Sequence, residues 1–190
     1  YIAVTYFAIK TTPKFKRTML VLALMPMSIF EAASLSYDAI LIPVSFLLFG
    51  YAMKLVIAPE GYMVSKKDIA VVLFSAFFLG GIKAAYLPFL LVLFAIPQRR
   101  FGTKKRYFTC IVIVATVALA AYAIPAAINQ AATHGVVLDS AKYAVMQTEY
   151  LTSHITEIPH ILLNTFQNLS LFYLTSFFGN LGWLDTNFPI

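Results

Sequence analysis

Long apolar runs separated by short basic clusters constrain this chain more than any other feature of its sequence. Residues 18–35, 39–58, 69–97 and 107–125 are rich in Leu, Val, Ile, Ala and Phe. A helix needs ~20 apolar residues to cross the hydrocarbon core of a bilayer. Only 12% of the residues are charged, about half of the ~25% that is usual in soluble proteins. The sequence therefore predicts an all-α, polytopic integral membrane protein, and it argues against a soluble globule and against disorder.

Basic residues gather between the apolar runs, where they predict which loops face the cytoplasm. One cluster spans residues 10–17, a second contains Lys66 and Lys67, and a third spans residues 99–106. Cytoplasmic loops carry an excess of Lys and Arg. We therefore expect Lys14, Lys66 and Lys104 on the cytoplasmic side, and Asp38, Lys142 and Glu157 outside. The net charge of +6 then reflects membrane topology, and no nucleic-acid partner is expected.

The chain is expected to form one transmembrane domain, with membrane spans in residues 1–125 and a mostly outer-face region in residues 126–190. Because Tyr1 lies inside an apolar stretch, we interpret the chain as a fragment of a longer polytopic protein. Apolar residues fall on one half of a helix over residues 143–155, which predicts an amphipathic helix on the outer leaflet. Residues 160–178 either span the membrane or lie half-buried, and the lack of basic residues beyond them favours the second alternative.

The segment 69–97 has basic clusters at both ends, so both ends are expected on the same side. As one straight helix its 29 residues would be roughly 43 Å long, against a hydrocarbon core of ~30 Å. We predict a half-spanning hairpin that bends at Gly80-Gly81, with Lys83 buried near its tip. The alternative is one strongly tilted helix.

Four ionisable residues lie inside or at the lip of the predicted membrane region: Glu31, Asp38, Lys83 and Asp185. A charge at membrane depth costs at least ~2.5–3.5 kcal/mol, so such residues are functional candidates. Glu31, Asp38 and Lys83 are expected to face the same side, where a cation between two carboxylates could hold an anionic headgroup. The alternative is structural: Asp38 would cap the helix that starts at Ala39, and a buried ion pair would neutralise Lys83.

Other patterns carry less chemical information. His154, Glu157 and His160 recur every three residues, but Pro159 interrupts the pattern, so a solvated outer loop is favoured over a metal site. No metal-binding residues are assigned. Cys110 is the single cysteine, so a disulfide framework is excluded. Lys54 lies near the end of an apolar run, where its side chain can reach the membrane surface by snorkelling.

Several motifs resemble a family of bacterial polytopic membrane proteins known only as a domain of unknown function. The similarity covers most of the chain, including the Ala8-Ile9-Lys10 segment, and the motifs follow the same order. They are Leu24-Met25-Pro26-Met27-Ser28, Ala32-Ala33-Ser34-Leu35-Ser36-Tyr37-Asp38-Ala39, Lys83-Ala84-Ala85-Tyr86-Leu87-Pro88 and Gly179-Asn180-Leu181-Gly182-Trp183-Leu184-Asp185.

That family is similar to the GT-C glycosyltransferases, which take a sugar from a polyprenyl-phosphate carrier at the outer membrane face. The resemblance implies a GT-C-like helical bundle in the bacterial cell membrane, with Asp38 as a candidate catalytic residue. It implies Lys83, Glu31, Asp185 and Trp183 as candidate substrate-binding residues, and it leaves open whether a divalent metal ion takes part. The main catalytic acid of such enzymes lies in an outer loop that would precede Tyr1. Two alternatives stay open: a transporter or flippase of lipid-linked glycans, and a non-catalytic membrane subunit.

Overall fold

The computed structural model describes residues 1–34, 36–132, 139–181 and 186–187, and within them the chain is almost entirely helical. The chain divides into two compact units, Tyr1–Ala127 and Ile128–Ile190. The prediction of an all-α protein is confirmed. The described strands are two residues long each, β1 (Asn180–Leu181) and β2 (Thr186–Asn187), and they pair antiparallel with Asn180 opposite Asn187.

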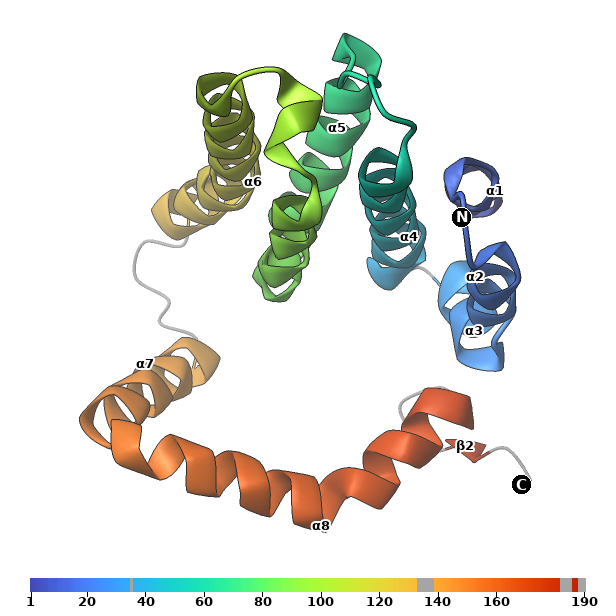
Figure 1. Ribbon diagram of the computed structural model, residues 1–190. Helices are drawn as coiled ribbons and strands as arrows, with labels where there is room; N and C mark the ends of the chain where they lie inside the picture. The colour runs from blue at the N-terminus through green and yellow to red at the C-terminus, as the bar shows by residue number, and fades with distance from the viewer. Residues whose placement is uncertain (35, 133–138, 182–185, 188–190) are drawn as a thin grey trace. The chain divides into compact units, whose positions relative to one another are not determined.

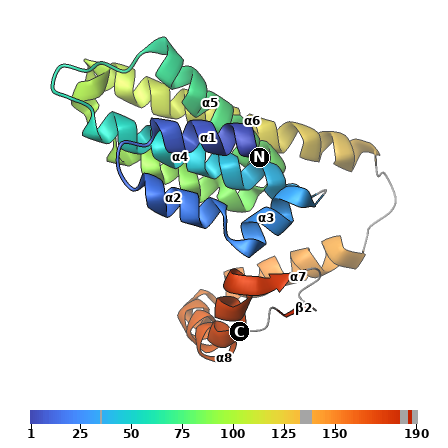
Figure 2. The ribbon, with the colours of Figure 1, turned by 90° about the vertical axis from the view of Figure 1, so that its right-hand side faces the viewer.

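The first unit begins with helices that pack around α4 (Asp38–Ile57). Helix α1 (Ile2–Thr11) lies along α4, and α2 (Lys16–Ala23) follows beside it (Figures 1 and 2). Gly50 of α4 lets α1 approach closely, because a Cβ at Gly50 would lie 2.4 Å from the buried Thr12 Oγ1. The apolar run at residues 18–35 does not form one continuous helix. It divides at Leu24 and Met25, and α3 (Pro26–Ala33) begins with Pro26, which favours a first helical turn.

The predicted hairpin is present, but its bend lies at Lys83 and not at the two glycines. Helix α5 (Lys66–Ile82) runs through Gly80 and Gly81, and Lys83 is extended with φ −151° and ψ 110°. The 3-10 helix η1 (Ala84–Ala95) then packs back against α5 and α4. Pro88 explains the break, because a proline ring in an α-helix clashes with the carbonyl four residues earlier, here that of Ala84. This break also excludes the alternative of one tilted helix.

The two limbs of the hairpin differ in residue number but match in length. The 17 residues of α5 rise about 25 Å at 1.5 Å per residue. The 12 residues of η1 rise about 24 Å at the 2.0 Å per residue of a 3-10 helix. An α-helical η1 would be about 6 Å shorter and could not join the same two ends. The 3-10 form therefore lets a short limb return the chain to the level at which α5 began.

The chain then leads through η2 (Gln98–Phe101) into α6 (Lys104–Ala132), which continues through Pro125. The core of the first unit lies between α4, α5, η1 and α6. Its buried members are mainly aliphatic: Leu41, Val44, Leu48, Leu55, Val72, Ala76, Leu79, Leu93, Val114 and Ala118. The hydrophobic faces of these four elements thus meet in one cluster.

Among the described residues, two helices are long and apolar enough to cross a membrane. They are α4 and residues 104–128 of α6. Most of α6 is not covered by protein, and large apolar side chains stand exposed along it: Phe108, Val112, Ile113, Leu119, Tyr122, Ile124 and Ile128. Apolar patches of this extent are rare on soluble monomers and mark a surface that needs an apolar partner. Contact with the lipid bilayer satisfies that need.

The second unit contains α7 (Asp139–Ser153), η3 (Ile155–Glu157) and α8 (Ile158–Gly179). Helix α7 covers most of the segment predicted to be amphipathic, and it exposes Tyr143, Met146 and Tyr150. Helix α8 exposes apolar residues along its length, including Leu162, Phe166 and Leu171. Helix α8 is not one of the two candidate spans found in the described part of the chain.

Candidate functional site

Asp38 and Lys83 lie together at one end of the first unit, which we call the tip. Asp38 is the first residue of α4, where a carboxylate is favoured by the positive end of the helix dipole. Lys83 lies at the bend between α5 and η1. Its Nζ atom is 3.8 Å from Asp38 Oδ1. The hairpin therefore places Lys83, the basic residue at its bend, at the start of a candidate membrane span.

Two neighbouring groups complete the polar cluster at the tip. The Tyr86 hydroxyl lies 3.5 Å from Asp38 Oδ1, and Tyr86 also interacts electrostatically with Glu31. Glu31 lies on α3, where its carboxylate accepts a 3.4 Å hydrogen bond from Ser34 Oγ. Tyr86 was not among the residues singled out from the sequence. Its signal was its position three residues after Lys83, and in the structure the Tyr86 amide donates to the Lys83 carbonyl at 3.0 Å.

The ion pair at the tip is loose and accessible. The side chain of Lys83 is 55% exposed and that of Asp38 is 29% exposed. The protein itself does not bury Lys83, so the alternative of an ion pair buried within the protein is wrong, and the depth of Lys83 in the membrane stays a prediction. Asp38 does not cap a helix starting at Ala39, because α4 begins at Asp38 itself, and the Asp38 amide donates to Ser36 Oγ. Exposed pairs of this kind contribute only ~0–1 kcal/mol to stability.

The remaining predicted site residues are not brought to the tip by anything that the structure describes. Trp183 and Asp185 lie outside the described residues. His154 bonds within its own helical turn, and Tyr150 donates a 2.8 Å hydrogen bond to Glu157. Among the described residues, no group of three or more His, Cys, Asp or Glu side chains is arranged to hold a metal ion.

A second polar cluster, centred on Asp68, lies at the other end of α4 and α5. Lys54 Nζ lies 2.9 Å from Asp68 Oδ1, and the Tyr62 hydroxyl donates to Oδ2 at 2.7 Å. Ser65 and Asp68 form a capping box at the start of α5. Asp68 is only 1% exposed. Sequence analysis gave Lys54 a snorkelling role, and the structure gives it a buried partner.

The Asp68 carboxylate is held in its charged form. Burial alone would raise the pKa of Asp68, but the hydrogen bonds that it accepts, from Tyr62 and then from Lys54, lower that pKa to about 2. The same hydrogen bond raises the pKa of the Tyr62 phenol. Each carboxylate oxygen of Asp68 has a close hydrogen-bond partner, so this cluster holds α4 and α5 together.

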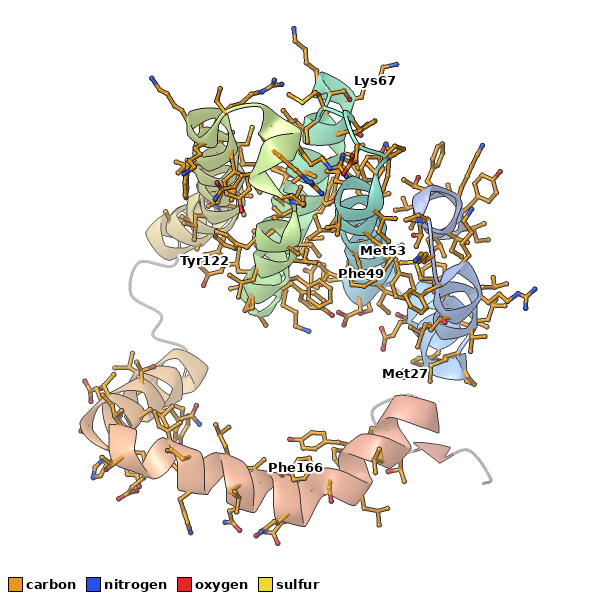
Figure 3. The ribbon with its side chains drawn as sticks, viewed as in Figure 1. Met27, Phe49, Met53, Lys67, Tyr122 and Phe166 are labelled. Carbon is orange, nitrogen blue, oxygen red and sulfur yellow. The ribbon has the colours of Figure 1, made fainter. Side chains whose placement is uncertain are left out.

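Arg100 ties η2 to the same end of the unit. Its guanidinium donates to the backbone carbonyls of Ala58 and Pro59, just beyond α4. The Val64 amide donates in turn to the Arg100 carbonyl at 2.9 Å. The start of α5 at Lys66 and the segment from Arg100 to Lys104 therefore lie at one end, which we call the basic end. Figure 3 labels Lys67 at this end of α5.

Comparison with known proteins places the chain in a family without showing its activity. No curated protein and no solved structure matches the chain. A family model with the description "Predicted membrane protein (DUF2142)" matches residues 1–190. The apolar surface of α6 and the two candidate spans agree with that description. Because the match covers the chain from end to end, this protein belongs to the DUF2142 family of predicted membrane proteins.

Proposed function

We propose that the chain is part of a GT-C-like glycosyltransferase in the bacterial cell membrane. It would be a multi-pass protein whose basic end faces the cytoplasm and whose tip lies at the outer face. Its donor would be a polyprenyl-phosphate-linked sugar used in cell-envelope glycan assembly. The observation that carries this proposal is the loose pair of Lys83 and Asp38 at the tip, 3.8 Å apart and partly open.

Lys83 is suited to a phosphate at this position. When a sugar leaves its carrier, negative charge grows on the departing lipid phosphate, and a fixed cation stabilises that charge. A cation fully neutralised by protein carboxylates could not do so. The pair with Asp38 is long and half-exposed, so the Lys83 ammonium can exchange its partner for a phosphate oxygen. Lys83 therefore has the reach and the free hydrogen-bonding capacity that a headgroup contact requires.

Asp38 would act on the acceptor. Its carboxylate can accept a hydrogen bond from a sugar hydroxyl, and the Tyr86 hydroxyl lies beside it as a second polar group. Glu31, on the neighbouring α3, adds negative charge to the same region.

Lipid binding at Lys83 can be tested by thermal unfolding with and without polyprenyl phosphate. We expect the lipid to raise the melting temperature of wild type and of Lys67→Met, but not of Lys83→Met. Lys67 is a matched control because it lies at the basic end of α5, opposite the end that Lys83 follows, and its side chain is exposed. Equal lipid-induced stabilisation of all three proteins would remove the lipid-phosphate role of Lys83.

A second experiment separates the enzyme from the alternatives. Purified protein is incubated with a radiolabelled polyprenyl-phosphate sugar and an acceptor glycan, and transfer of label to the acceptor is measured. If the chain is part of a glycosyltransferase, we expect label to reach the acceptor. Asp38→Asn should then abolish this transfer without loss of donor binding. Binding with no transfer, together with donor movement across vesicles, would identify a transporter or flippase. If the protein neither binds the donor nor transfers the label, the remaining alternative is a non-catalytic membrane subunit.

A further inference from the structure

A pocket at the basic end is separate from the tip. It has a volume of about 250 Å³, below the range usual for drug-sized ligands, and suits a small headgroup. The loop after α4 forms one wall and η2 forms the other. Its lining residues are Glu60, Gly61, Tyr62, Met63, Arg99 and Arg100. Gly61 has φ +87° and open space where a side chain would stand, so the backbone is accessible there.

Arg100 makes this pocket more than a basic surface. The residue is 4% exposed, and its two terminal nitrogens are occupied by the carbonyls of Ala58 and Pro59. Its third nitrogen, Nε, is buried without a hydrogen-bond partner. A buried donor without a partner destabilises the fold, and an anion bound in the pocket could supply the missing acceptor. Arg99 is exposed beside it and can reach the same anion.

The charge around the pocket favours an anion strongly. Arg99, Arg100, Lys104, Lys105 and Arg106 fall within eight residues that contain no acid. Glu60 is the one carboxylate among the lining residues. The ion pairs of the described residues are Lys54–Asp68 and Lys83–Asp38, so Glu60 neutralises neither arginine. Arg99 can offer a phosphate two parallel hydrogen bonds, a mode that arginine favours, and Arg100 can add one from Nε because its terminal nitrogens are occupied.

The surroundings favour a phosphate that is attached to a lipid. The pocket lies just beyond the end of α4, a candidate membrane span, at the level where lipid headgroups meet a crossing helix. Met63, which lines the pocket, and Ile57, the last residue of α4, are exposed apolar side chains. Acyl chains can cover these side chains while the headgroup reaches the arginines. Basic pockets at helix ends on a membrane surface are typical headgroup sites.

We propose that this pocket binds the phosphate of an anionic phospholipid headgroup, with Arg99 and the Arg100 Nε as its hydrogen-bond donors. The bound headgroup would join the loop after α4 to η2, two segments that Arg100 already connects. The site depends on neither Lys83 nor the proposed transfer reaction.

The test uses the whole chain in nanodiscs of phosphatidylcholine with increasing phosphatidylglycerol, and lipid binding is measured by native mass spectrometry. We expect Arg99→Gln to weaken phosphatidylglycerol binding about tenfold and Glu60→Gln to strengthen it. Lys105→Gln removes the same charge outside the pocket and is expected to keep most of the binding. Arg100 stays intact in all three, so its support of α4 is preserved.

Three outcomes would overturn the assignment. Equal losses in Arg99→Gln and Lys105→Gln would show diffuse attraction to a charged surface in place of a pocket. Equal binding of phosphatidylcholine and phosphatidylglycerol would show no preference for an anion. Stabilisation of the detergent-solubilised protein by millimolar inorganic phosphate, with no further effect of phosphatidylglycerol, would identify a soluble phosphate as the ligand.

Discussion

Gly80 lies directly against the backbone of Ala118, so that a Cβ at position 80 would be 2.3 Å from the Ala118 carbonyl oxygen. This contact joins α5 to α6, and both residues are in or beside the buried core. Gly81 makes a wider contact, in which a Cβ would lie 3.3 Å from the Ala121 side chain. The two glycines therefore set how closely two helices pack.

This difference predicts unequal effects of the same substitution. Gly80→Ala should destabilise the protein by ~1–3 kcal/mol, because α5 and α6 must move apart to admit the methyl group. Gly81→Ala should cost clearly less, since its new contact is only slightly tight. Thermal unfolding in detergent measures both. Equal melting temperatures for the two variants would show that the α5–α6 contact is not close-packed.

The two lysine ion pairs should respond differently to removal of the cation. Lys83→Met should change stability by less than ~1 kcal/mol, because its pair with Asp38 is partly exposed. Lys54→Met leaves the buried Asp68 carboxylate without its cation and should cost about 2 kcal/mol, below the ~3–5 kcal/mol of a fully buried pair because Lys54 is one third exposed. Melting temperatures of both variants, measured without added lipid, test the contrast. A larger loss in Lys83→Met would contradict it.

Asp68 should make stability depend on pH in the acid range. The pKa of Asp68 is about 2 in the folded chain and 3.8 as an ordinary carboxyl, so the unfolded chain binds the proton more readily. Its contribution is complete above about pH 4 and disappears as the pH falls toward 2, a loss of about 2 kcal/mol.

This dependence is measured by unfolding wild type, Asp68→Asn and Glu60→Gln between pH 2 and pH 6. Asp68→Asn should be less stable at pH 6 and should lose less on acidification. Glu60→Gln, an exposed change in the adjacent loop, should follow the wild type. An unchanged acid loss in Asp68→Asn would assign the effect to other carboxyl groups.

The orientation of the first unit can be tested by cysteine labelling. In a Cys110→Ser background, Lys66→Cys should react with an impermeant maleimide only from the cytoplasmic side of sealed vesicles. Tyr37→Cys, which is exposed next to Asp38, should react only from the outside. The reason is the excess of basic residues at the end that carries Lys66. Labelling of Lys66→Cys from outside alone would reverse the proposed topology.

Helical class and the hairpin could be predicted from the sequence because they depend on local patterns. Apolar runs of spanning length specify helices, and basic clusters on both sides of residues 69–97 require the chain to return. The position of the bend was missed, although Pro88 carried a usable signal for it. Glycine was weighed as a bend-forming residue, whereas here its missing side chain serves packing against α6.

Only the tertiary structure decided which charges meet and how deeply they lie. Lys54 was expected only to snorkel, yet it forms an ion pair with the buried Asp68 because α4 and α5 bring the two residues together. The equal limbs of the hairpin carry Lys83 to a position beside Asp38 that the protein itself leaves open. Apolar patterning along one chain determines that helices form and that lipid surrounds them. Which charged side chains become partners, and how deeply each is buried, depends on the register between the helices. Side-chain volumes on several elements determine that register jointly.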